Sequence, residues 1–148
     1  MYKVLNILFL LVTFGCGEVV AGERLSRDDA VALTRKGIAL IKAVGRDKAF
    51  AEFSNPSGPY AGRDFGVMDM NGKMLVYGEN AKMAGKDLKD IRDVDGKAFL
   101  KDGIDMLQTV QSGWVDFKWP DPLTQKLARK SVYMERFGEI AVGSGVYN

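Results

Sequence analysis

The order of the predicted elements favours an α+β domain built around an antiparallel sheet. The hydrophobic periodicity predicts helix, helix, two strands, helix and then three strands along the 148 residues. Strands and helices therefore segregate, whereas a parallel α/β fold would alternate them. The length suits one domain with one core, and we expect one face of the sheet to carry the long N-terminal helix.

The first long helix is predicted to begin at Ser26. The Ser26 hydroxyl can accept from the amide of Asp29, whose carboxylate can reach back in a capping box. Apolar and small residues then recur at helical spacing on one face, at Leu33, Gly37, Ile38, Ile41 and Val44. Gly45 is suited to end this helix, and a short second helix is predicted to end before Pro56.

A β-hairpin is the strongest strand signal in the chain. Residues 64–70 (DFGVMDM) and 73–77 (KMLVY) are apolar-rich runs that flank the turn dipeptide Asn71-Gly72. Residues 78–95 then form a long polar connection without sustained periodicity. The hairpin thus supplies the first two strands.

The second half of the chain predicts one helix and three strands. A helix is expected to resume near Gly96, with a common face formed by Phe99, Gly103, Met106, Leu107 and Val110. Strands are expected over 113–120, 130–136 and 139–147, with a turn at Phe137-Gly138. Prolines at 120 and 122 end the first of these strands, because proline cannot donate to a β-ladder.

The composition excludes several classes of chemistry. The chain has no histidine and one cysteine, so Ser-His-Asp and Cys-His sites, histidine-ligated zinc and intramolecular disulfides are ruled out. A net charge of +2 without a basic cluster argues against a nucleic-acid surface. No phosphate loop, calcium loop or nucleophile elbow passes a check of its spacing. We therefore expect a protein that is not an enzyme and uses no cofactor or metal.

The N-terminal segment has the pattern of a secretory signal. Lys3 precedes an apolar run from Val4 to Phe14, too short for a membrane-spanning helix. We predict cleavage after Ala21, with residues 1–21 as signal peptide, residues 22–148 as the domain, and a periplasmic or secreted location. The alternative is lipid anchoring at Cys16, for which V-T-F-G is a poor recognition sequence.

The stretch G-W-V-D-F-K-W-P-D-P, residues 113–122, holds both tryptophans of the chain. In an extended strand Trp114 and Asp116 point to one face, whereas Val115, Phe117 and Trp119 point to the other. These aromatic residues can be ordinary core, with Trp114 on the surface. They can equally be the wall of a pocket for a small polar ligand.

An ordered series of phrases resembles a single Cache domain, the extracytoplasmic sensor module of bacteria. The phrases are D-K-A-F-A-E-F-S-N (47–55), F-G-V-M-D-M-N-G-K-M-L (65–75), G-K-D-L (85–88), D-V-D-G-K-A-F (93–99), the aromatic stretch, K-S-V-Y-M (130–134) and V-G-S-G-V-Y (142–147). Together they span nearly all of residues 28–148. The resemblance implies a PAS-like antiparallel sheet with a long N-terminal helix and a pocket on the far side of the sheet.

The resemblance also implies that the pocket binds small organic acids or similar metabolites. The expected pocket residues are Tyr77, Trp114, Phe117, Trp119, Lys130 and Tyr133. Lys130 is the expected partner of a carboxylate, with Tyr77 and Tyr133 as donors. Tyr77-Gly78 ends the second strand where many members have His-Pro or His-Gly. Strand alternation places Lys130 and Tyr133 on opposite faces, as it does Trp114 and Phe117, so we expect three or four of the six in the pocket.

Two functions remain as hypotheses from the sequence. The first is an exported small-molecule binding or sensory domain, without an output module of its own because the chain ends at Asn148. Its partner would be a membrane sensor kinase or chemoreceptor. The alternative is a protein–protein interaction module that docks a periplasmic sensor or self-associates through its sheet or long helix.

Overall fold

The computed structural model describes residues 24–148, so the predicted signal peptide and Cys16 lie outside the described residues. Helix α1 spans Arg27–Val44 and helix α2 spans Arg46–Phe53. The capping box is present: Ser26 Oγ accepts from the Asp29 amide at 3.1 Å, and the Ser26 amide donates to Asp29 Oδ2 at 2.9 Å. Gly45, at φ 84°, ends α1 as predicted.

Five strands form one antiparallel sheet in the order β2-β1-β5-β4-β3. Their bounds are β1 Phe65–Asp69, β2 Met74–Tyr77, β3 Ser112–Pro120, β4 Leu127–Phe137 and β5 Ile140–Tyr147. The chain is therefore an α+β domain with the predicted antiparallel sheet. The C-terminal strand β5 lies at its centre, between the first hairpin and the last one.

The β1–β2 hairpin turns where the sequence predicts it. The amide of Gly72 donates to the Asp69 carbonyl at 3.1 Å, and Gly72 has φ 95°, a conformation that favours glycine. Asp69 Oδ1 accepts from the amides of Asn71 and Lys73 at 2.9 and 3.0 Å. The side chain of Asp69 thus holds the turn in place.

Two details of the helices differ from the prediction. Helix α3 spans Phe99–Met106 and begins three residues after Gly96, because Gly96 lies in a turn at φ 82°. Val110 follows the end of α3 and is 48% exposed, and Val44, the last residue of α1, is 43% exposed. The connection before α3 also holds a short 3-10 helix, η1 (Ala81–Met83).

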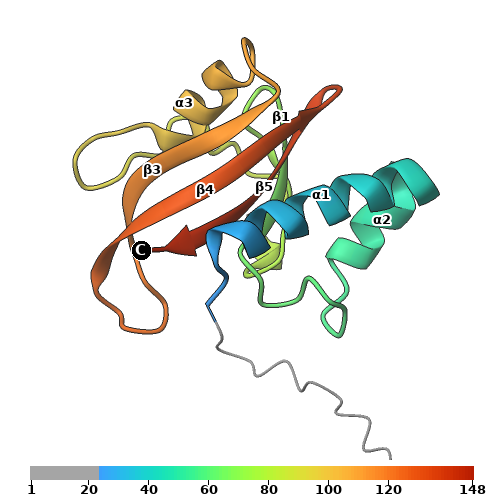
Figure 1. Ribbon diagram of the computed structural model, residues 1–148, viewed down its shortest axis with the longest axis horizontal. Helices are drawn as coiled ribbons and strands as arrows, with labels where there is room; N and C mark the ends of the chain where they lie inside the picture. Colours follow the sequence, from blue (N-terminus) through green and yellow to red (C-terminus); the bar gives the residue numbers. More distant parts are fainter. Residues whose placement is uncertain (1–23) are drawn as a thin grey trace, which may run out of the picture.

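Side chains on the two faces of the sheet form two cores. Helices α1 and α2 cover one face, where Ile38, Phe53, Phe65, Val67 and Val142 pack together. Helix α3 covers part of the other face, where the packed residues include Met68, Phe99, Leu107, Val115, Phe117 and Met134 (Figure 1). Adjacent residues such as Val67 and Met68 alternate between the cores, as strand geometry requires. Within residues 24–148, no helix is both long and apolar enough to cross a bilayer.

Candidate functional site

A cavity of about 1060 Å³ lies on the face of the sheet opposite α1. Strands β1, β2, β3, β4 and β5 all contribute to its lining, together with the loop around η1 and residues of α3. Three lining residues on β1 and β5 are glycines, namely Gly66, Gly143 and Gly145. A Cβ at Gly143 would lie 2.8 Å from the backbone oxygen of Tyr133, and one at Gly145 would overlap the Asp64 carboxylate, so these glycines let neighbouring groups approach β5 closely.

Lys130 on β4 is the buried cation of the cavity. The β-ladders place it opposite Phe117 on β3 and opposite Tyr147 on β5. Its Nζ lies 6.0 Å from the centroid of the Phe117 ring and 5.0 Å from that of the Tyr147 ring. The residue is only 4% exposed. A lysine this buried needs a compensating anion, since an unpaired charge in a protein interior is strongly unfavourable.

Asp64 provides that anion. Its carboxylate forms an ion pair with Lys130 Nζ, and its side chain is 14% exposed. Gly145 makes room for the pair: a Cβ at this position would overlap the Asp64 carboxylate and lie 2.7 Å from Lys130 Cε. The amide of Gly145 also donates to the Asp64 carbonyl at 3.0 Å, which fixes the segment that precedes β1.

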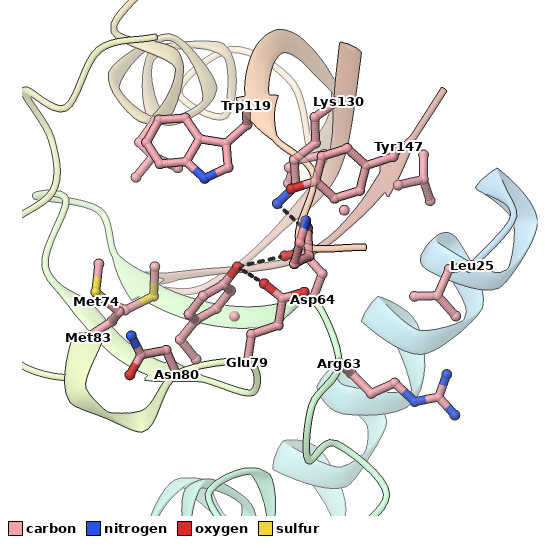
Figure 2. Close-up of a pocket in the computed structure, with 18 of the residues that line it drawn as sticks. Leu25, Arg63, Asp64, Met74, Glu79, Asn80, Met83, Trp119, Lys130 and Tyr147 are labelled. Atoms are coloured by element: carbon pink, nitrogen blue, oxygen red, sulfur yellow. Dashed lines mark hydrogen bonds and ion pairs between the residues drawn. The ribbon is translucent and has the colours of Figure 1, made fainter. Parts of the chain in front are cut away.

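A phenol joins Asp64 to a second carboxylate. The Tyr77 hydroxyl lies 3.2 Å from Asp64 Oδ1 and 2.7 Å from Glu79 Oε2. Figure 2 shows these acidic groups facing one another below Lys130 and Tyr147. Tyr147 is held at the rim, where its hydroxyl donates to the Pro120 carbonyl at 3.0 Å. The polar end of the cavity therefore contains a lysine, two carboxylates and two phenols.

Burial and charge shift the pKa values of these groups. Burial, reinforced by Asp64, raises the pKa of Glu79. Burial and the neighbouring Asp64 and Glu79 raise the pKa of Tyr77, which stays a neutral phenol. Burial on its own would lower the pKa of Lys130, but the ion pair with Asp64 outweighs it and the pKa is raised. Lys130 is therefore charged at neutral pH, and the raised pKa of Glu79 makes this carboxyl easier to protonate on acidification.

The opposite end of the cavity is apolar. Trp119 and the thioether side chains of Met74 and Met83 lie at this end in Figure 2. Phe99 of α3 stacks on Phe117 with ring centroids 3.8 Å apart and meets the Trp119 ring edge-on at 5.3 Å. The site thus combines a charged end with an aromatic and methionine-lined end, an arrangement typical of small-molecule pockets.

Two arginines also line the cavity but are directed elsewhere. Arg24 forms an ion pair with the buried Asp121 at 2.5 Å. The guanidinium of Arg63 points away from Asp64 and Lys130 in Figure 2. Lys130 is consequently the cation that faces the acidic groups.

Four of the six predicted pocket residues line this cavity: Tyr77, Phe117, Trp119 and Lys130. The other two lie on the face covered by α1. The Trp114 and Tyr133 rings pack against each other with centroids 5.4 Å apart, Arg27 lies 3.7 Å over Trp114, and Arg35 contacts the Tyr133 hydroxyl at 3.4 Å. Strand alternation explains the division, since Trp114 is three residues from Phe117 and Tyr133 three residues from Lys130.

Sequence reasoning missed three polar residues of the site, Asp64, Glu79 and Tyr147. Glu79 lies beyond the end of β2, where no periodicity marks a direction. Asp64 begins the predicted run 64–70, and strand alternation places it on the same face as Gly66 and Met68. Tyr147 had a signal, because it lies two residues beyond Gly145 and therefore on the same face of β5 as Gly143 and Gly145.

The family model that describes Cache domain sequences matches residues 61–148 of this chain. The chain belongs to the Cache domain family. The match covers β1 through β5, and therefore includes Asp64, Tyr77, Glu79, Lys130 and Tyr147, whereas α1 and α2 precede it.

Known relatives of this Cache domain belong to chemotaxis receptors. The methyl-accepting chemotaxis protein McpP of Pseudomonas putida is 34% identical over an alignment of 86 residues, which covers 56% of this chain and 16% of McpP. The similarity is thus to a small part of a much longer protein. The Cache domain is thus related to sensor domains of chemotaxis receptors.

Solved structures share the fold. A methyl-accepting chemotaxis protein from Vibrio parahaemolyticus superposes with a TM-score of 0.67 at 23% identity, over 81% of this chain and 86% of that one. A Cache chemosensory domain described in terms of carboxylic acid recognition gives a TM-score of 0.65 at 21% identity, over 81% and 91% of the two chains. At these identities the likeness establishes the fold, a PAS-like Cache architecture.

Proposed function

We propose that this Cache domain is an extracytoplasmic sensor that binds a small organic acid in the cavity and reports its occupancy to a signalling partner. The observation that carries the proposal is Lys130, a lysine only 4% exposed that faces the cavity between two aromatic rings. A carboxylate that leaves water needs a cation and hydroxyl donors in place of its hydration shell. Lys130 supplies the cation, and the Tyr77 hydroxyl lies at the same end of the cavity, where it is hydrogen-bonded to Asp64 and Glu79.

The apolar end of the cavity gives the rest of such a ligand an environment of matching polarity. Phe117, Trp119 and Met74 offer rings and a thioether to a hydrocarbon body. Removing apolar surface from water contributes about 25 cal/mol per Å². An acid with a carboxylate head and a short apolar or aromatic body would satisfy both ends.

The proposed signalling partner is a membrane chemoreceptor or sensor kinase. The relatives support this, since they include chemotaxis receptors. Helix α1 is the element suited to pass the signal on: Thr34 on α1 is hydrogen-bonded to Ser144 on β5 at 3.1 Å. Ser144 precedes Gly145, which contacts the Asp64–Lys130 pair, so β5 joins the cavity to α1.

A thermal-shift screen tests ligand binding. The panel contains short mono- and dicarboxylates, amino acids and polyamines. A ligand at a hundredfold excess over its Kd stabilises the fold by about 2.7 kcal/mol, which raises Tm by roughly 5 to 15 °C for a domain of this size. A panel in which no carboxylate raises Tm would contradict organic-acid binding.

Lys130→Met tests the assigned role of the lysine. The change keeps an apolar stem and removes the charge, so the affinity for the acid should fall at least about tenfold, the range of one charge-assisted hydrogen bond. Lys118→Met is the matched control: Lys118 lies on the neighbouring strand β3, pairs with Asp95 at 2.9 Å and does not line this cavity. Unchanged affinity in Lys130→Met, measured by isothermal titration calorimetry, would remove Lys130 from the site.

A further inference from the structure

The place that a ligand carboxylate would take at Lys130 is already occupied by a carboxylate of the chain itself. Asp64 forms an ion pair with Lys130 Nζ inside the cavity, and the glycine at 145 is what allows the two groups to meet. A ligand carboxylate must therefore displace Asp64 or share the lysine with it. Either event places another negative charge beside those of Asp64 and Glu79.

The donors around these acids are too few for that added charge. Tyr77 lies within hydrogen-bonding distance of both Asp64 and Glu79, yet a phenol has one proton and can donate to only one carboxylate at a time. Lys130 supplies the only cation that faces the pair among the described residues, because Arg24 is held by Asp121 and Arg63 points away. With Lys130 positive and both acids ionised, the polar end already carries one net negative charge.

We infer that Asp64 competes with the ligand for Lys130, and that an organic acid binds together with one proton, taken up by the Asp64–Glu79 pair. This inference rests on the proposed function and names the residue pair that sets the pH dependence of binding. The proton converts one carboxylate into a neutral donor. It removes the repulsion among three like charges and leaves Lys130 to the ligand.

The groups that face the pair act in opposite directions: burial and Asp64 raise the pKa of Glu79, whereas the hydrogen bond from Tyr77 and the charge of Lys130 lower it, and the pKa is raised overall in the free protein. Asp64 precedes β1, Glu79 follows β2, and Tyr77, Lys130 and Tyr147 complete the surroundings from β2, β4 and β5. The negative charge of a ligand carboxylate raises the pKa of Glu79 further. The pair then has one pKa in the free protein and a higher pKa in the ligand-bound protein. The affinity for the ligand is constant at pH values below the first pKa, and it falls about tenfold per pH unit between the first and the second.

The experiment is isothermal titration calorimetry of the protein with propionate between about pH 5 and pH 8, in buffers of different ionisation enthalpy. The expected result is uptake of about one proton per propionate bound, with an affinity that weakens as pH rises. Asp64→Asn removes the competitor. It should tighten propionate binding about tenfold or more at neutral pH and flatten the pH profile.

Glu79→Gln provides a second test that leaves the Lys130–Asp64 pair intact, and it should reduce proton uptake. The matched control is Glu135→Gln. Tyr133 and Glu135 on β4 repeat the tyrosine–glutamate pair at the same spacing, with a 2.8 Å hydrogen bond, on the face away from the cavity. This control should bind propionate with the proton uptake of the unmodified protein. Circular dichroism verifies that each variant is folded.

The outcomes separate the inference from the function on which it rests. Propionate binding by the unmodified protein without proton uptake overturns the inference and leaves acid binding in place. Binding by Asp64→Asn where the unmodified protein binds none supports the competition. Absence of propionate binding in both proteins at every pH overturns the inference, and the carboxylate panel then decides organic-acid binding on its own.

Discussion

Lys130 and Asp64 can be buried as charged groups only as a pair. Each charge is withdrawn from water, with side-chain exposures of 5% and 14%, and each is compensated by the other. Removing one member of a buried pair leaves an uncompensated charge, whereas replacing both with apolar groups is often neutral. The pair is therefore better explained by its place in the cavity than by a need for stability.

A double-mutant cycle tests this view. Asp64→Ala should lower the free energy of unfolding by about 3 kcal/mol, because the buried Lys130 then loses its ion-pair partner. Asp64→Ala combined with Lys130→Met should recover most of that loss. Urea unfolding of the two singles and the double gives the coupling energy. If the losses of the two single variants simply add in the double variant, the coupling energy is zero. That result would contradict a pairwise role.

At the scale of elements, α1 packs on the sheet through a glycine. A Cβ at Gly37 would lie 2.6 Å from Cζ and 2.7 Å from Cε2 of Phe65, whose ring is fully buried. Phe65 is itself packed edge-on against Phe53 at 4.8 Å, so the ring has little freedom to move. The approach of α1 to β1 thus depends on the missing side chain.

Gly37→Ala should destabilise the protein even though alanine favours a helix by about 1 kcal/mol over glycine. Overpacking against Phe65 should outweigh that gain and lower the free energy of unfolding by about 1 to 3 kcal/mol. Gly103→Ala on α3 is the comparison, because its new Cβ meets the flexible end of Met134 and should cost less. Urea denaturation measures both, and a Gly37→Ala protein more stable than the original would refute the packing argument.

Local structure that depends on residues close together in the sequence was predictable. Contacts between residues far apart in the sequence were not. The capping box at Ser26 and the Asn71-Gly72 turn are local, and both form as predicted. Strand alternation likewise predicts that Trp114 and Phe117 face opposite sides. The meeting of Asp64 with Lys130 depends on β5 pairing with both β1 and β4, a long-range arrangement that local patterns do not encode.

In the whole molecule, the two tryptophans lie on opposite sides of one sheet and report different events. Trp119 lines the cavity, whereas Trp114 lies under Arg27 of α1, with the guanidinium carbon 3.7 Å from the ring centroid. Tryptophan emission depends on the surroundings of the ring. Trp119 should therefore respond to occupancy, and Trp114 to displacement of α1.

Two single-tryptophan variants separate these events. With Trp114→Phe, ligand binding should change the emission of Trp119 directly. With Trp119→Phe, the remaining Trp114 should also respond, because β5 contacts both the Asp64–Lys130 pair and Thr34 of α1. Binding that alters Trp119 emission while Trp114 emission stays constant would show that α1 does not move relative to the sheet. Transmission through this helix would then be excluded, since a ligand shifts a conformational equilibrium only when its affinities for the two states differ.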